Sequence, residues 1–251
     1  MKITIITVCF NSATTIRDTI ESVKSQDYKN IEYIIVDGKS TDNTLDIINE
    51  YPEVVSVIIS EKDNGLYDAM NKGIELATGD IIGILNSDDF YSYSTVLAEV
   101  SQTFRSNPEG DMVLGNVNFV TPDNLNKPVR FYSSYNFSPW KMRFGFMPAH
   151  PATFIKRSAY GKVGMYSLEY KIGADFNWFV RAFFLHKLRY AKLNKTLVTM
   201  REGGVSTAGI SSYWLSSKEQ VKALCSSGVR SNLLFILVRL PIKFFQKYFS
   251  K

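Results

Sequence analysis

The first ninety residues contain four short apolar segments separated by stretches with helical periodicity. Residues 2–8, 31–36, 54–60 and 81–85 are rich in isoleucine and valine, and runs of this kind form buried strands. Apolar side chains then recur every three to four residues over 66–77, which is the pattern of one helix face. Strands that alternate with helices predict an α/β fold, doubly wound, with a mostly parallel central sheet flanked by helices.

Aspartates follow three of these four strands closely. Asp37 ends the second strand, Asp63 lies just beyond the third, and Asp88 and Asp89 follow the fourth. Because the carboxyl ends of parallel strands share one edge of a sheet, these side chains are expected to converge on one pocket. The alternative is local: an aspartate after a strand often caps the next helix, and an Asp-Asp pair can form a solvated turn.

The adjacent carboxylates of Asp88 and Asp89 repel each other unless positive charge lies beside them. A hard divalent cation that phosphate oxygens also hold supplies that charge, so the pair indicates Mg²⁺ or Mn²⁺ with a phosphorylated ligand. The helix over 66–77 is expected to end at Gly79 in a left-handed cap. The chain would then return through the fourth strand and deliver the acid pair to the sheet edge.

The composition narrows the class of protein. With 251 residues the chain can bury a core without disulfides, and Cys9 and Cys225 lack metal-ligand spacing, so both are expected to be reduced and structural. No secretory signal pattern precedes the first strand, and a cytoplasmic location is expected. The net charge of +5 has much of its excess after Phe137, among aromatic side chains, which favours a membrane surface over nucleic acid.

The last twenty residues combine basic and aromatic side chains, but their apolar run is too short to span a membrane. Arg239, Lys243, Lys247 and Lys251 recur every four residues and would gather on one side of a helix. This pattern predicts an amphipathic helix on an anionic lipid surface, peripheral on the inner face of the cytoplasmic membrane. The alternative is that this segment packs on the rest of the protein.

Three segments together resemble the family-two inverting glycosyltransferases. They are Ile-Thr-Val-Cys-Phe-Asn at 6–11, Ile-Val-Asp-Gly-Lys-Ser-Thr-Asp-Asn-Thr at 35–44, and the stretch 63–89 that runs from Asp-Asn-Gly-Leu-Tyr-Asp to Leu-Asn-Ser-Asp-Asp. The resemblance covers about residues 2–206, and the chain is similar to bacterial surface-polysaccharide glycosyltransferases. It implies a GT-A type fold, a nucleotide-diphosphate-sugar donor, Mg²⁺ or Mn²⁺, and inversion at the anomeric carbon.

The resemblance also assigns residues to the donor and the metal. Asp37 matches the position that binds the nucleobase, and Asp88 and Asp89 fall on the metal motif usually written Asp-x-Asp. Asn86 occupies the first aspartate position of that motif, which leaves metal ligation mainly to Asp88. The implied donor-binding positions are Thr7, Val8, Asp37, Asp63, Lys72, Asn86, Ser87 and Asp88.

Three further positions are assigned to the reaction centre and its acceptor side. Asp175, in the first turn of a helix that runs to residue 185, matches the general base of the family, although an aspartate there also suits the helix dipole. His150 either touches donor phosphate, metal or acceptor, or is a structural hydrogen-bonding residue. Gly203 and Gly204 match a loop that closes near the donor, and they would also suit any turn.

Residues 131–146 are rich in aromatic side chains, which could form a platform for an acceptor sugar or simply pack in the core. The expected organisation is a glycosyltransferase domain over 1–210, with a nucleotide-binding half at 1–105 and an acceptor and catalytic-base half at 106–210. Residues 211–251 would form a helical, membrane-associating extension.

The implied function is transfer of a sugar, from a UDP-sugar by preference, to a glycan or polyprenyl-diphosphate-linked acceptor in cell-envelope polysaccharide biosynthesis. A dehydrogenase on a dinucleotide fold is disfavoured, because residues 8–13 lack the glycine-rich turn that a pyrophosphate requires. A sugar nucleotidyltransferase shares the sheet, the metal and the substrate type. A non-catalytic sugar-nucleotide or lipid-binding scaffold stays open because of Asn86.

Overall fold

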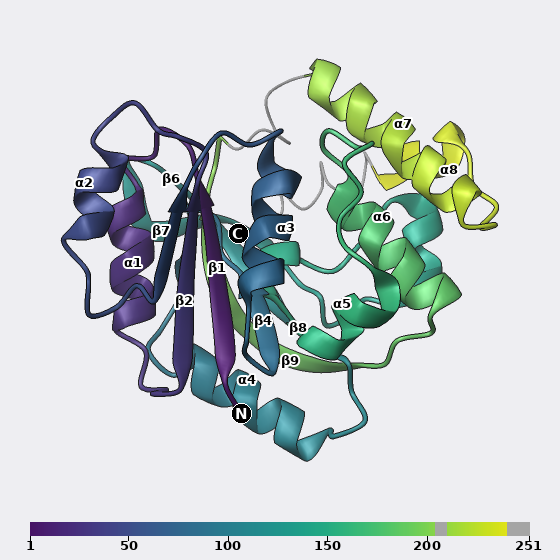
Figure 1. Cartoon of the computed structure of the whole chain (residues 1–251). Helices are drawn as coiled ribbons and strands as arrows, with labels where there is room; N and C mark the ends of the chain where they lie inside the picture. Colours follow the sequence, from purple (N-terminus) through teal and green to yellow (C-terminus); the bar gives the residue numbers. More distant parts are fainter. Residues whose placement is uncertain (204–209, 240–251) are drawn as a thin grey trace.

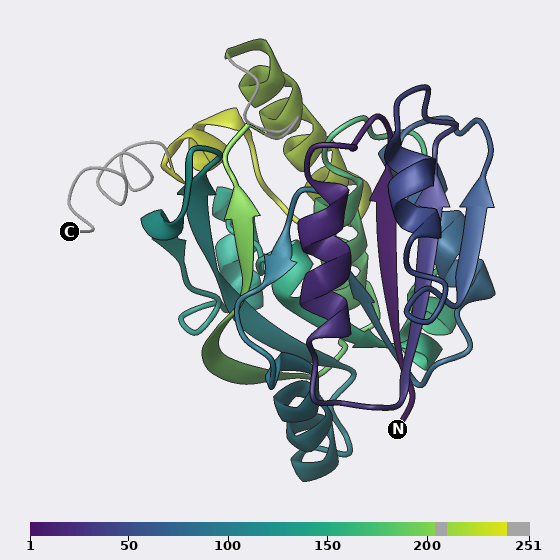
Figure 2. The same cartoon turned by 90° about the vertical axis from the view of Figure 1, so that its left-hand side faces the viewer.

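A computed structural model describes residues 1–203 and 210–239 of the chain (Figures 1 and 2). Within these residues a single twisted sheet runs through the molecule and helices cover both of its faces. The strands of the N-terminal half are β1 (Ile3–Cys9), β2 (Ile31–Asp37), β3 (Val57–Ser60) and β4 (Ile81–Ile84). They lie in the order β3-β2-β1-β4 and all pair in parallel, as the apolar runs predict.

The second half makes the sheet mixed. Its strands are β5 (Phe90–Tyr91), β6 (Met112–Thr121), β7 (Asn124–Tyr132), β8 (Thr153–Lys156) and β9 (Tyr190–Arg201). β8 lies antiparallel between β4 and β6, β7 forms an antiparallel hairpin with β6, and β5 lies antiparallel to β9, while β6 and β9 are parallel. The prediction of a mostly parallel sheet is therefore confirmed for β1–β4. The sheet as a whole is mixed, within an α/β fold.

Helices on the two faces enclose two apolar cores. One face carries α1 (Ile16–Lys24), α2 (Thr44–Asn49) and α4 (Val96–Ser106). The other carries α3 (Leu66–Leu76), α5 (Arg157–Val163), α6 (Ala174–Val180) and α7 (Ile210–Ser226). Single turns of 3₁₀-helix, η1 (Pro139–Phe144) and η2 (His150–Ala152), and a π-helical segment, η3 (Arg181–Leu185), complete this half. Side chains alternate across β1, so that Ile5 enters one core and Ile6 the other.

Two local expectations are wrong. The third strand begins at Val57 rather than at residue 54, because the N–H groups of Val54 and Val55 bond to the carbonyl of Tyr51 in the turn after α2. Gly79 is not a left-handed cap: α3 ends at Leu76, and the glycines with positive φ lie elsewhere. Gly79 serves close packing instead, since a Cβ there would lie 2.8 Å from the backbone nitrogen of Thr4.

The C-terminal part of the described chain packs on the second core. α8 (Leu233–Leu237) buries Ile236, and the ring of Phe235 stacks on Phe144 of η1 at 5.4 Å. Arg239 is only 3% exposed, and its guanidinium donates to Gln220 Oε1 at 2.6 Å and to the carbonyl of Gly145 at 3.2 Å. The prediction that Arg239 joins a lipid-facing basic stripe is therefore wrong, because the side chain is used to anchor α8.

The other members of that stripe, Lys243, Lys247 and Lys251, lie outside the described residues. Among the residues that the structure does describe, no helix is both long enough and apolar enough to cross a membrane. Cys9 is buried and Cys225 is exposed, and both are free thiols; the burial of Cys9 agrees with the expected structural role, whereas the exposure of Cys225 does not.

Candidate active site

The carboxyl ends of β1, β2 and β4 meet at one edge of the sheet, at the upper edge in Figure 1. Ser12, after β1, and Ser87, after β4, share a hydrogen bond of 2.8 Å between their hydroxyl oxygens. On the other side of β1, Gly38 lies against Asp63, because a Cβ built on Gly38 would sit 2.5 Å from Asp63 Oδ2. The parallel register thus brings the loops that carry the predicted aspartates side by side.

Asp88 and Asp89 occupy this edge in different environments. Asp88 is half-buried, whereas Asp89 is only 1% exposed and accepts a hydrogen bond of 3.2 Å from the amide of Asn86. Burial raises the pKa of both carboxyls, and the neighbouring charge of Asp88 raises that of Asp89 further. The pair is therefore a site where added positive charge would be strongly favourable.

Arg201, at the end of β9, contacts this pair and was not among the predicted site residues. It is 9% exposed, donates to the backbone carbonyl of Asp88 at 2.6 Å, and forms an ion pair with Asp18 of α1. Its positive charge opposes the rise in the pKa of Asp88 and Asp89. The short antiparallel pairing of β9 with β5, the strand that directly follows the acid pair, places it there, a relation that no local motif reveals.

The oxygens of this edge fit a hard divalent cation. Asn86 Oδ1 and Asp89 Oδ1 are buried and meet no hydrogen-bond donor among the described residues. Such orphaned oxygens are costly unless a donor or a cation satisfies them, and Mg²⁺ and Mn²⁺ prefer oxygen ligands. In the described part of the chain no three His, Cys, Asp or Glu side chains form a metal cage. A cation here would therefore complete its shell with oxygens of a ligand or water.

The residues predicted to line the nucleoside are enclosed in the protein, and their predicted contacts with a donor stay predictions. Asp37 has no exposed surface, and its carboxylate accepts hydrogen bonds from Ser40 and from the hydroxyl of Ser60 at 2.7 Å. Thr7 and Val8 are also buried, and the Thr7 hydroxyl pairs with Tyr33 at 3.0 Å, inside the core. These three positions hold the strand ends together.

The side chains that face solvent in this region lie in the loops just beyond the ends of β1 and β3. Phe10, just after β1, is 61% exposed, and its ring lies against Gly38. Asp63 is half-buried and accepts the N–H of Gly65 at 2.9 Å. The ammonium of Lys72, a predicted diphosphate contact, pairs with Glu61 at 2.7 Å and with Asp68 at 3.6 Å, and its role at the donor stays a prediction.

Asp175 lies in the first turn of α6, as predicted, and faces the first turn of α3. Its Oδ1 accepts the N–H of Phe176 at 2.7 Å and lies 3.2 Å from the hydroxyl of Tyr67. Burial raises the pKa of this carboxyl, against the opposing effects of His150 and these hydrogen bonds. Because α3 begins just beyond the carboxyl end of β3, Asp175 stands at the same edge of the sheet as the acid pair.

A chain of polar rings lies beside Asp175. His150 Nε2 is 2.9 Å from the hydroxyl of Tyr166, which lies 3.2 Å from that of Tyr160. Burial lowers the pKa of His150, and the charge of Asp175 opposes this. His150 is thus hydrogen-bonded within the structure and also adjoins the candidate base, so both of its predicted interpretations stay open.

The predicted loop after β9 is described only at its start. Gly203 is exposed with a φ of +123°, and a Cβ on it would meet nothing within 4 Å. Gly204 lies outside the described residues. Of the aromatic segment, Phe137 is buried in the core, whereas Tyr135 and Trp140 are more than half exposed.

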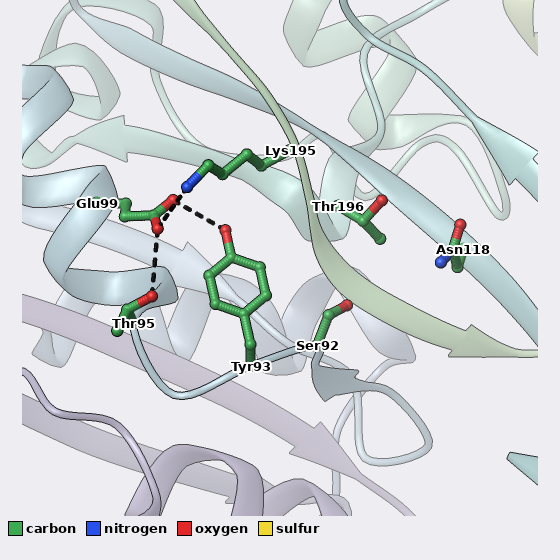
Figure 3. A pocket seen from close by; sticks show the side chains of 7 residues that line it. All are labelled: Ser92, Tyr93, Thr95, Glu99, Asn118, Lys195 and Thr196. Carbon is green, nitrogen blue, oxygen red and sulfur yellow. Dashed lines mark hydrogen bonds and ion pairs between the residues drawn. The ribbon is translucent and has the colours of Figure 1, made fainter. Parts of the chain in front are cut away.

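A surface pocket of about 470 Å³ is lined by residues that follow β5 and by residues of α4, β6 and β9, and none of the predicted site residues lines it (Figure 3). The carboxylate of Glu99 in its wall already accepts hydrogen bonds from Lys195 at 2.7 Å, Tyr93 at 2.9 Å and Thr95 at 3.2 Å. The pocket therefore offers no free charged group to a ligand.

The fold and this edge define an α/β enzyme with an acidic site of the kind that binds phosphorylated ligands. The chain belongs to glycosyl transferase family 2, whose profile matches residues 4–170, and it is a glycosyltransferase. This confirms the predicted family and the enzyme class.

Two glycosyltransferases that are similar in sequence agree with this family assignment. A PGL/p-HBAD biosynthesis glycosyltransferase of Mycobacterium tuberculosis is 30% identical over 242 residues, which cover 94% of this chain and 89% of the relative. The Escherichia coli protein named UDP-Glc:alpha-D-GlcNAc-diphosphoundecaprenol beta-1,3-glucosyltransferase WfaP is 45% identical over 92 residues, 36% of each chain.

Solved structures share the fold. S. aureus TarS in complex with UDP-GlcNAc matches with a TM-score of 0.69 and 16% identity, covering 100% of this chain and 73% of that one. The mannosyltransferase PcManGT of Pyrobaculum calidifontis, in complex with GDP-Man and Mn²⁺, matches with a TM-score of 0.64 and 18% identity, covering 98% and 69%. At these identities the likeness is one of fold, and it supports the GT-A-like description.

Proposed function

We propose that this chain transfers a sugar from a nucleotide-diphosphate-sugar donor, a UDP-sugar by preference, to a hydroxyl of a glycan or lipid-linked acceptor in polysaccharide or glycolipid assembly. The observation that carries the proposal is Asp175, a half-buried carboxylate of raised pKa that stands at the same sheet edge as the acid pair. Two relatives support the substrate class, since one structure contains UDP-GlcNAc and the name of WfaP gives a UDP-glucose donor and a diphosphoundecaprenol acceptor.

Asp175 acts as the general base in this proposal. Its Oδ1 already accepts the N–H of Phe176 and faces Tyr67, so Oδ2 takes the proton of the acceptor hydroxyl. The acceptor oxygen forms a bond to the anomeric carbon while the bond from that carbon to the donor diphosphate breaks on the opposite face. The products are a glycoside of inverted configuration and a nucleoside diphosphate, with the proton left on Asp175.

Asp88 would hold Mg²⁺ or Mn²⁺, with the orphaned oxygens of Asn86 and Asp89 beside it. When bound, the cation would neutralise the charge of the leaving diphosphate. Arg201 holds the backbone of Asp88 in place through its carbonyl. The Mn²⁺ in the PcManGT structure supports this part of the proposal.

The donor nucleoside would lie between Phe10 and Asp63. The exposed ring of Phe10 offers a flat face, and aromatic faces stack on nucleobases. Asp37 would reach a base only if the hydroxyl of Ser40 or Ser60 turned away from it, so its role is the rigid support of this loop. Ser87 supports the diphosphate side through Ser12.

The products distinguish this proposal from its rivals. Incubation of the protein with a UDP-sugar, Mn²⁺ and a lipid-linked acceptor should release UDP and transfer the sugar. A sugar nucleotidyltransferase would instead form or consume pyrophosphate, and a scaffold would release neither. Pyrophosphate as the product, or no UDP with any sugar nucleotide tested, would contradict the proposal.

The same protein would act at the inner face of the cytoplasmic membrane. η1 and α8 together expose an apolar surface, the α8 patch, made of Trp140, Leu234, Phe235 and Val238. Arg143, within η1, and Arg230, shortly before α8, are both exposed, and the Ser231 hydroxyl donates to the carbonyl of Arg143 at 2.8 Å. Apolar side chains with cations on the same segments suit an anionic lipid surface, where a lipid-linked acceptor would be found.

A further inference from the structure

A single carboxylate of α7 binds the loop that leads into α6. Glu219 accepts the backbone N–H groups of Lys171 at 2.8 Å, Ile172 at 3.0 Å and Gly173 at 2.8 Å. Glu219 is only 8% exposed, so these three bonds to an ionised group are shielded from water. Three successive N–H groups that point at one anion fix the path of the backbone between them.

The bound loop touches Asp175 through Tyr67. The Tyr67 hydroxyl donates to the carbonyl of Ile172 and also lies 3.2 Å from Asp175 Oδ1. A hydroxyl carries one proton, so the carbonyl and the carboxylate compete for it. The position of the Ile172 carbonyl therefore sets how strongly Tyr67 bonds to the base, and such a bond lowers the pKa of Asp175.

The fit between the loop and Glu219 is close. A Cβ built on Gly173 would lie 3.2 Å from Glu219 Oε2 and 3.3 Å from Glu219 Cβ. The neighbouring ion pair of Lys222 with Glu169 is largely exposed at its 3.1 Å contact, and exposed pairs contribute little. Glu219 is therefore the group on α7 that holds this loop.

We propose that Glu219 is a positioning residue for Asp175, acting through the loop 171–173 and the hydroxyl of Tyr67. This inference rests on the proposed role of Asp175 as the base. Without the carboxylate, the Ile172 carbonyl moves away, the Tyr67 hydroxyl donates its hydrogen bond to Asp175 instead while keeping its proton, and Asp175 becomes a weaker and less precisely oriented base.

Glu219→Gln tests the inference, because glutamine keeps the volume but turns an N–H₂ group toward backbone N–H groups. The carboxyl carbon of Asp175, followed by NMR across pH, should titrate at a lower pKa than in the wild type. UDP released from a UDP-sugar should show kcat reduced by roughly 10- to 100-fold, with KM for the donor within about twofold. Glu169→Gln makes the same chemical change at the exposed pair and should alter neither quantity.

Each part of the result has one meaning. An unchanged Asp175 titration in Glu219→Gln overturns the positioning role, whatever happens to the rate. A lowered pKa with full turnover contradicts the role of Asp175 as the base, and the proposed function falls with it. If Glu219→Gln does not fold, Gly173→Ala presses a methyl group against the same carboxylate and should shift the Asp175 titration in the same direction; no shift there overturns the inference.

Discussion

At the scale of single residues, the site is built from carboxyls that the fold has partly removed from water. Asp89 is almost fully buried with one orphaned oxygen, and Asp175 is half-buried against Tyr67. Burial raises the pKa of both groups, so their ionised forms are disfavoured in the folded state. Such groups lower stability, which is the usual consequence of assembling charge for catalysis or ligand binding.

Asp175→Asn should therefore stabilise the protein at neutral pH. When folding raises the pKa of a carboxyl, the folded protein loses stability as the pH rises from the pKa of that group in the unfolded chain to its pKa in the folded protein. Above this pH range a neutral amide at the same position is favoured. Thermal unfolding at pH 7 should show a higher Tm for the variant, by roughly 2–4 °C for each kcal/mol gained. The difference should vanish at a pH below the ordinary range of aspartate, and a lower Tm at pH 7 would contradict this reasoning.

The sequence identified residues of the site better than it identified their contacts. Asp88, Asp89 and Asp175 all reach the same sheet edge, because strand ends and helix starts follow from local patterns. Asp37 matched a base-binding position, and its carboxylate is bonded by Ser40 of its own loop and by the hydroxyl of Ser60 at the end of β3, a contact that no local spacing shows. Arg201 depends on a contact across more than a hundred residues, which no local spacing encodes.

At the scale of elements, α3 joins the two halves of the site. It packs on β1 through Gly73, because a Cβ there would lie 2.4 Å from Ile6 Cγ2. On its other side, Asn71 exchanges hydrogen bonds of 2.9 and 3.0 Å with the backbone of Tyr166. The position of α3 thus couples the strand ends to the loop that precedes Asp175.

Gly73→Ala should loosen this junction. Ile6 is β-branched and stiff in a buried strand, so the added methyl group must push α3 outward. Urea unfolding should show a free energy of unfolding lower by roughly 1–3 kcal/mol. Gly161→Ala is the matched control, since Gly161 is a helical glycine of α5 with open space around it, and that change should raise stability by about 0.5–1 kcal/mol. Equal effects of the two changes would show that close packing of α3 is unimportant.

The four parallel strands could be predicted because their buried runs and intervening helices carry strong periodic signals. The mixed half could not, because β8 enters between β4 and β6 by antiparallel pairing that depends on the tertiary fold. The hairpin of β6 and β7 likewise depends on pairing along two strands, with shifts of register at Phe119–Val120 and Val120–Thr121.

At the scale of the whole molecule, α7 lies between α6, which carries Asp175, and α8, which carries most of the α8 patch; Figure 1 shows these three helices on one side of the sheet. Glu219 of α7 holds the loop before Asp175, and the adjacent Gln220 holds Arg239. The division of the chain at residue 210 stays a prediction, although α7 packs closely on α6.

Removal of the α8 patch should weaken membrane binding without altering the site. The double variant Trp140→Ser, Phe235→Ser should sediment with phosphatidylglycerol-containing vesicles on the order of tenfold more weakly than the wild type. Leu76→Ser is the control, because Leu76 is an exposed leucine at the C-terminal end of α3 and is not part of the α8 patch. If the wild type, the double variant and Leu76→Ser bound these vesicles equally, this surface would be excluded as the lipid contact. The same conclusion would follow if the wild type bound vesicles of phosphatidylcholine alone as strongly as vesicles that contain phosphatidylglycerol.

The central claim is that Asp175 accepts the proton of the acceptor hydroxyl while the sheet edge that carries Asp88 and Asp89 holds the donor. Its most direct test compares UDP affinity and UDP-sugar turnover in the wild type and in Asp175→Asn, with Asp46→Asn as the control for an aspartate in a helix first turn. The account predicts that Asp175→Asn loses roughly 10²- to 10⁴-fold in turnover and keeps Mn²⁺-dependent UDP affinity, while the control keeps both. Near-full turnover in Asp175→Asn would contradict the account.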